Sequence, residues 1–180
     1  LGTASGREGE FGEIAWFEND GSEDFTKHTF FQQSSDEARP SYALACDLDF
    51  DGDIDIVSMI CRINRIVWFE NDGSQSFVQN EIPYPLNRTL SLDTTDIDND
   101  GDIDILANTI NSNLVICFEN NGNQEYTTNV LANNFHGAAD VYSTDLDKDG
   151  DMDILATAHN TTSFQIKWWE NTLISSNKEI

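Results

Sequence analysis

The feature that most constrains this chain is an acidic nine-residue motif that occurs three times at a fixed interval. The copies begin at Asp47, Asp96 and Asp145, so each starts 49 residues after the previous one. A second motif, seen most clearly as Trp68-Phe69-Glu70-Asn71, occurs four times and runs in phase with the first. A period near 50 residues indicates a repeat architecture, in which each unit buries its faces against its neighbours. The approximate units are 1–35, 36–84, 85–133 and 134–180.

Within a unit, period-two hydrophobicity and turn residues predict four short antiparallel β-strands. Two adjoining apolar segments, around Val57 and Val67, are apolar on both faces, which is typical of strands covered by sheets on either side. About 50 residues per four-stranded sheet is the size of a β-propeller blade. The sequence therefore predicts an all-β fold of about four blade equivalents, a partial or half propeller with almost no helix. In the second unit we expect strands at 42–46, 54–60, 65–70 and 76–81, with a hairpin turn at 71–73.

Composition excludes several classes of protein. The net charge is −24, with 33 acidic residues against 9 basic ones, and nucleic-acid binding needs a basic surface instead. No apolar run approaches the roughly 20 residues of a membrane-spanning helix, so we expect no membrane insertion. The N-terminus shows no secretion signal, which we interpret as removed or outside this sequence. The three cysteines fit neither a disulfide framework nor a zinc site, and we interpret them as small buried hydrophobic residues.

The acidic motif has the chemistry of a cation site. Oxygen ligands at alternate positions, with a sharp glycine turn at the sixth, suit a hard cation that takes about six to eight oxygens. We expect carboxylates from positions one, three, five and nine and a backbone carbonyl from position seven. Calcium fits this flexible set better than magnesium, which requires a tight octahedron. The sequence therefore predicts up to three Ca²⁺ ions, bound by Asp47, Asp49, Asp51, Asp53 and Asp55, by Asp96, Asp98, Asp100, Asp102 and Asp104, and by Asp145, Asp147, Asp149, Asp151 and Asp153.

An EF-hand is the main structural rival for such a loop, and its twelfth position argues against it. An EF-hand requires a bidentate Glu there, whereas this chain has Ser58, Ala107 and Ala156. The residues after each glycine also favour a strand over a helix. A solvated acidic turn without metal is the other alternative, and three copies with glycine in register disfavour it.

Together, the motif Asp-x-Asp-x-Asp-Gly-Asp-x-Asp, the apolar strand after it and the element Trp-Phe-Glu-Asn-Asp-Gly resemble the FG-GAP/VCBS repeat family over nearly the whole chain. The resemblance implies a secreted, extracellular or cell-surface, calcium-stabilised propeller. It further implies a role in adhesion, in carbohydrate binding or as an accessory to a secreted enzyme. Such propellers usually have seven blades, so we expect either part of a longer array or half of a ring completed by a second copy.

The predicted function is a noncatalytic binding or adhesion module whose partner is a carbohydrate or an extracellular protein. A glycosidase carboxylate pair normally occurs once. We therefore interpret the Glu in each of the four aromatic motifs as a hydrogen-bond partner of the adjoining hairpin, and the tryptophans of these motifs as core residues. Residues that break the repeat are better ligand candidates, because variable positions usually carry recognition. On the presumed innermost strands these are Tyr42, Asp93, Asp140 and Tyr142.

Two alternatives stay open beside this prediction. One is the noncatalytic propeller part of a secreted polysaccharide-degrading enzyme. The other is a subunit of a cell-surface fibre or an oligomeric ring. In the second case the chain would self-associate through open blade faces, because an incomplete propeller leaves apolar faces and strand edges in water.

Overall fold

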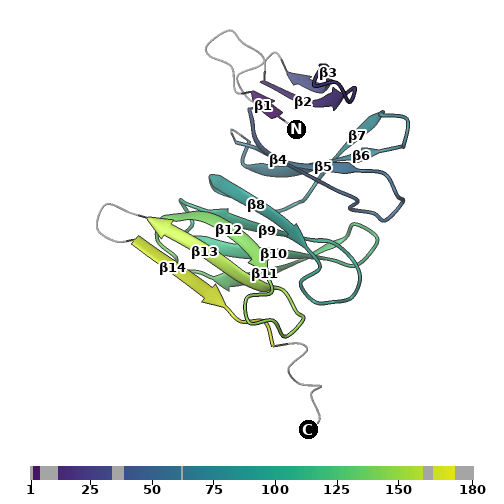
Figure 1. Cartoon of the computed structure of the whole chain (residues 1–180). Coiled ribbons are helices and arrows are strands. Elements are labelled where there is room, and N and C mark those ends of the chain that lie inside the picture. Colours follow the sequence, from purple (N-terminus) through teal and green to yellow (C-terminus); the bar gives the residue numbers. More distant parts are fainter. Residues whose placement is uncertain (1, 5–11, 34–38, 62, 160–163, 173–180) are drawn as a thin grey trace. The chain divides into compact units, whose positions relative to one another are not determined.

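The computed structural model describes residues 2–4, 12–33, 39–61, 63–159 and 164–172. These residues form fourteen β-strands and no helix, in four sheets whose strand pairs are all antiparallel (Figure 1). The all-β prediction is therefore confirmed. Nothing among them resembles a helix of the length and apolarity that a bilayer crossing requires.

Each sheet is a meander, in which strands that are consecutive in the chain are neighbours in the sheet. The expected four strands are present in the second and third sheets, and the first and fourth contain three each among the described residues. In the second sheet the predicted bounds agree with the observed ones to within two residues. The strands are β1 (Gly2–Ala4), β2 (Gly12–Asn19) and β3 (Phe25–Gln33); β4 (Pro40–Cys46), β5 (Asp55–Ile60), β6 (Arg65–Asn71) and β7 (Phe77–Glu81); β8 (Thr89–Thr95), β9 (Asp104–Thr109), β10 (Leu114–Asn120) and β11 (Tyr126–Ala132); β12 (Ala138–Thr144), β13 (Asp153–His159) and β14 (Phe164–Trp169).

The first two sheets belong to one compact unit, and the last two belong to another. In the first unit, Ile14 of β2 packs with Ile56, Val67 and Phe69 of the second sheet. All six residues of β5 are buried, as its two-sided apolar sequence predicts. This core excludes water between the two sheets.

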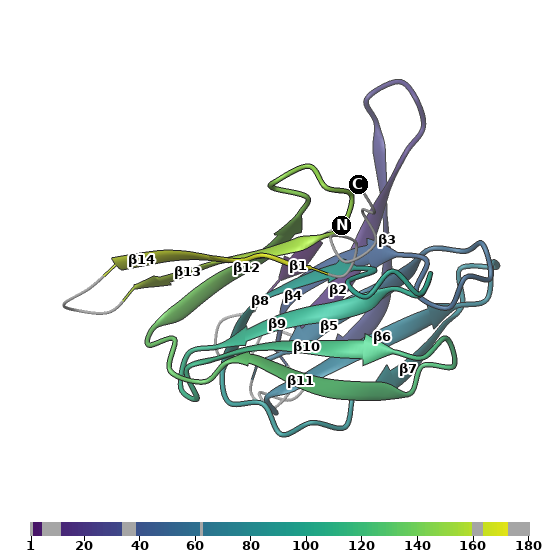
Figure 2. The same ribbon diagram turned by 90° about the horizontal axis from the view of Figure 1, so that it is seen from below.

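In the second unit the core lies between the third and fourth sheets, which Figure 2 shows from below. Val115 and Cys117 of β10 belong to the same buried cluster as Ile154 and Ala156 of β13. Burial also raises the pKa of the Cys117 thiol far above its ordinary value. The prediction of a buried cysteine is thus confirmed for Cys117.

The remaining cysteines and the tryptophans are less uniform than the sequence predicts. Cys46 and Cys61 are only partly buried, and none of the three cysteines forms a disulfide. Trp68 lies in the core, as expected, whereas Trp168 is 41% exposed. Trp16 stacks on His28, with 4.2 Å between ring centroids.

Candidate metal centre

Each acidic loop joins the first two strands of its sheet: β4 to β5, β8 to β9 and β12 to β13. The sixth residue of each loop is a glycine in the left-handed region, where a side chain is disfavoured, with φ of 97° at Gly52, 100° at Gly101 and 104° at Gly150. The fourth residue also has positive φ in all three loops. Because this backbone conformation recurs, the loops present their side chains in the same way.

Three carboxylates converge in every loop, from positions one, three and nine. The ligand-type oxygens of each triplet all lie within 4.8 Å of one another, which is the spacing needed to share one ion. The ninth-position carboxylate is fully buried in each case. The triplets are Asp47, Asp49 and Asp55; Asp96, Asp98 and Asp104; and Asp145, Asp147 and Asp153.

The fifth-position carboxylates have another use in the loop. Asp51 accepts a hydrogen bond from the backbone N–H of Asp53, at 2.9 Å, and Asp100 accepts one from Asp102 at the same distance. The third loop repeats this contact. These carboxylates shape the turn and lie outside the triplets, and their role as ligands stays a prediction.

In the first two loops the seventh-position side chains, those of Asp53 and Asp102, point toward the hairpin turn of their own sheet. A Cβ atom added to Gly122 would lie 2.6 Å from Oδ2 of Asp102, and Gly73 has the same close approach to Asp53. Glycine is needed at these turns both for its positive φ and to leave room for the carboxylate. The acidic loop and the turn after the aromatic motif are therefore in contact.

The buried ninth-position carboxylate joins the two sequence motifs. In the second loop, Oδ2 of Asp104 accepts a hydrogen bond from the backbone N–H of Ile97, at 2.8 Å. Its Oδ1 accepts another from the backbone N–H of Asn120, also at 2.8 Å. Asp55 and Asp153 accept the same bond, at 2.8 Å, from the corresponding asparagines. This explains why the acidic and aromatic motifs run in phase.

The asparagine of the aromatic motif completes this connection with its side chain. Its Nδ2 donates to the carbonyl oxygen of the residue before the ninth-position Asp, at 3.1 Å from Asn71, 3.3 Å from Asn120 and 3.2 Å from Asn171. We call the paired contacts between this Asp and this Asn the Asp–Asn lock. The sequence predicts these aspartates as metal ligands but does not predict their bonds to the asparagines, although the nearly constant spacing of the two motifs was a signal for the lock.

The electrostatics of the loops suit a cation. Burial raises the pKa of Asp104 to about 6, and burial followed by the charges of nearby acidic groups raises that of Asp98. Oδ1 of Asp47 and Oδ1 of Asp96 are buried and accept no hydrogen bond. An unsatisfied buried carboxylate oxygen is costly, and a divalent cation would compensate it. The residues present therefore fit a hard, oxygen-liganded ion such as Ca²⁺.

The four predicted ligand-binding residues have different surroundings: the two aspartates form hydrogen bonds between sheets, and the two tyrosines differ in exposure. Oδ2 of Asp93 accepts hydrogen bonds from the N–H and the hydroxyl of Ser143, at 2.6 and 2.7 Å. Asp140 accepts one from the hydroxyl of Ser91. These bonds connect β8 with β12. Tyr142 is exposed on β12, and Tyr42 is half-buried on β4, so a ligand role for the four stays a prediction.

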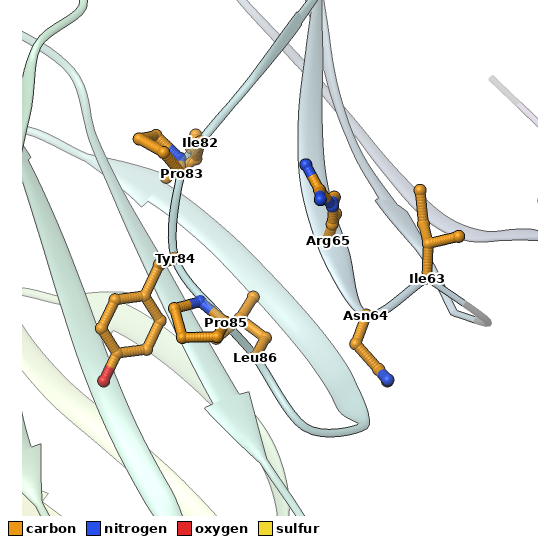
Figure 3. A pocket seen from close by; sticks show the side chains of 8 residues that line it. All are labelled: Ile63, Asn64, Arg65, Ile82, Pro83, Tyr84, Pro85 and Leu86. Carbon is orange, nitrogen blue, oxygen red and sulfur yellow. The ribbon is translucent and has the colours of Figure 1, made fainter.

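The sequence did not predict a pocket of about 430 Å³ in the first unit (Figure 3). Its walls are residues 63–65, where β6 begins, and residues 82–86, which follow β7. Tyr84 stands between two prolines on one wall, and Arg65, which pairs with Glu81, stands on the other. The sequence Pro83-Tyr84-Pro85 was the available signal, because prolines fix the backbone around the ring.

Comparison with known proteins gives one finding. A family model for the FG-GAP-like repeat matches residues 62–107 and 96–156, which together make up more than half of the chain. The matched region contains the second and third acidic loops and the aromatic motifs at residues 68–71 and 117–120. No curated protein matches the chain significantly.

Proposed function

This chain belongs to the FG-GAP-like repeat family, and from that premise we propose that it is a calcium-stabilised, β-propeller-like binding module. The observation that carries the proposal is the threefold recurrence of the same carboxylate triplet. Each triplet gathers negative charges that repel one another unless a cation lies between them. Three bound Ca²⁺ ions would add six positive charges and change the net charge from −24 to −18.

Calcium in this proposal has a structural role. The triplet residues at positions one and three belong to the loop, and the one at position nine begins the second strand. Because that residue also holds the third strand through the Asp–Asn lock, an ion at the triplet would order three strands together. At free calcium ten times the dissociation constant, each site would add about 1.4 kcal/mol to the stability.

The proposal includes an extracellular location and a noncatalytic role, since FG-GAP repeats are typically extracellular and noncatalytic. The proposed partner is a carbohydrate or an extracellular protein. The pocket beside Tyr84 is the place we propose for contact with it, because it combines an aromatic ring with the polar groups of Asn64 and Arg65.

Calorimetric titration of the EDTA-treated chain tests the metal proposal. We expect CaCl₂ to bind at up to three sites, to raise the melting temperature and to bind more tightly than MgCl₂. Asp96→Ala should remove one site. Asp24→Asn, which removes a charge from an exposed turn outside the loops, should remove none. If Ca²⁺ produces no heat and no change in melting temperature, the proposal is wrong.

A glycan array with and without calcium tests the partner. We expect binding that needs calcium and is lost in Tyr84→Ala. The melting temperature of this variant should stay within a few degrees of the parent chain, since Tyr84 is only half-buried. Binding that survives in Tyr84→Ala would place the ligand elsewhere.

A further inference from the structure

The fourth sheet has one covered face and one open face. We define the open face by the row Tyr142, Leu155 and Trp168, which the strand register places side by side, together with Ile166 and Phe164 of β14. Ile166 is 77% exposed and Phe164 is 84% exposed. None of these five side chains is charged, although the chain as a whole is strongly acidic. The charged residue of the next row is Asp140, which the register aligns with Thr157 and Ile166 and which accepts a hydrogen bond from Ser91.

The equivalent face of the third sheet is covered. The repeat aligns Leu155 with Leu106, Trp168 with Cys117 and Ile166 with Val115. Leu106 and Cys117 are again directly opposite one another in the register. All three third-sheet residues are at most 1% exposed, because they pack against the fourth sheet. The open face of the fourth sheet is therefore equivalent, in the repeat, to a face that is buried between two sheets in the third.

The burial of β13 leads to the same conclusion. All six residues of β9 are buried, whereas in β13 the residues from Ile154 to Ala158 alternate between buried and half-buried. The half-buried side of β13 nevertheless carries the apolar residue Leu155, and Ile154 and Ala156 on either side of it point to the buried side. A strand that is apolar on both sides is typical of a sheet covered on both faces.

The face of the third sheet is covered by one side of the fourth sheet, and the first sheet has a side equivalent to that covering surface. Trp169 lies on the side of the fourth sheet that packs against the third. In the aromatic motif, Trp169 aligns with Phe69, which packs toward the first sheet, and with Phe17 of β2. Because side chains alternate along a strand, Phe17 points away from Ile14, which faces the second sheet. Phe17 is 48% exposed, so the described residues of its own unit leave this part of the surface uncovered, whereas Ala15 on the same side of β2 is 2% exposed.

We propose that the open face of β12–β14 binds a second copy of this chain, through the Phe17 face of that copy's first sheet. The contact would continue the packing already seen between the third and fourth sheets. It joins two different surfaces, so successive copies either close into a ring or extend into a fibre. The proposal goes beyond the calcium-binding function and does not require any ligand.

The experiment measures the mass of the 180-residue chain by sedimentation velocity between about 1 and 100 µM, a range that brackets micromolar dissociation constants. We expect species above the monomer mass of 20.2 kDa. Ile166→Glu should weaken association by about tenfold or more, because it places a charge where a large apolar side chain is buried. Val78→Glu is the matched control, since Val78 is 56% exposed on β7, outside both surfaces. It should associate like the parent chain.

A mixing experiment tests the two-surface arrangement and shows that the variants fold. Phe17→Glu and Ile166→Glu should each be monomeric alone at the low end of this concentration range, because each lacks one of the two surfaces. Mixed together, they should form a dimer of twice the monomer mass, since each supplies the surface that the other lacks. A parent chain that stays at 20.2 kDa throughout would overturn the proposal. So would variants that associate like Val78→Glu, or a mixture that stays monomeric.

Discussion

The Asp–Asn lock predicts that Asn120 stabilises the chain far more than the matching residue of the first sheet. Asn120 is 3% exposed, and its side chain makes three hydrogen bonds. It donates to the carbonyl of Ile103 and accepts from the N–H groups of Gly122 and Gln124, at 3.3, 3.2 and 3.1 Å. Asn120→Ala removes all three and leaves the backbone bond to Asp104 in place.

The magnitude follows from these contacts. A net hydrogen bond contributes about 0.5–1.5 kcal/mol, and the Gly122 and Gln124 donors lie near solvent that can replace part of the loss. We therefore expect Asn120→Ala to lower the free energy of unfolding by about 2–3 kcal/mol. For a chain of this size that corresponds to a melting temperature lower by about 5–10 °C. In Asn19→Ala, where the side chain is exposed and accepts one bond from Gly21, the loss should stay below about 1 kcal/mol.

Urea denaturation in EDTA, followed by circular dichroism, measures both variants without a contribution from bound calcium. The comparison is valid if the slope of the unfolding free energy against urea concentration is the same in both variants, because the same amount of surface is then exposed on unfolding. The reasoning is refuted if the two asparagine variants differ by less than about 0.5 kcal/mol, the usual size of a neutral surface substitution.

Two shorter predictions concern other carboxylates. The hydroxyl of Ser74 is the largest cause of the lowered pKa of Asp72, so Ser74→Ala should raise that pKa toward 3.8, as measured by NMR titration of the carboxyl carbon; an unchanged pKa would contradict this assignment. Asp93→Ala should destabilise the chain by about 2 kcal/mol in urea denaturation, because Ser143 loses two hydrogen bonds to a charged acceptor. A variant of unchanged stability that loses ligand binding would instead support the ligand role predicted for Asp93.

The repeat pattern made much of the fold predictable. Fixed spacing places equivalent residues at equivalent positions, and two-sided apolar strands identify β5 as covered on both faces. The loops were recognisable because glycine and alternating aspartates determine the backbone locally. The carboxylates that share a triplet were less predictable, since Asp51 and Asp53 have the same side chain as Asp47. Their different contacts arise from the direction in which the folded loop points each one.

Features that depend on several segments could not be read from one sequence motif. The pocket beside Tyr84 combines the start of β6 with the segment after β7, and the prolines around Tyr84 indicate only one of its two walls. The exposure of Trp168 also differs from that of Trp68, although both occupy the first position of the aromatic motif. Their surroundings differ because burial depends on the neighbouring sheet, which the motif does not encode.

The lock also explains where this repeat can vary. The bonded Asp and Asn are 16 residues apart in the second and third sheets and 18 apart in the fourth, yet the bond measures 2.8 Å in all three. The chain between them is a hairpin, so a change in its length is absorbed at the turn far from the lock. The acidic loops lie at the locked end, and residues 63–65 of the pocket lie at the turn end. A metal that orders the locked end would therefore leave the opposite end free to diverge, which is where a binding module needs its differences.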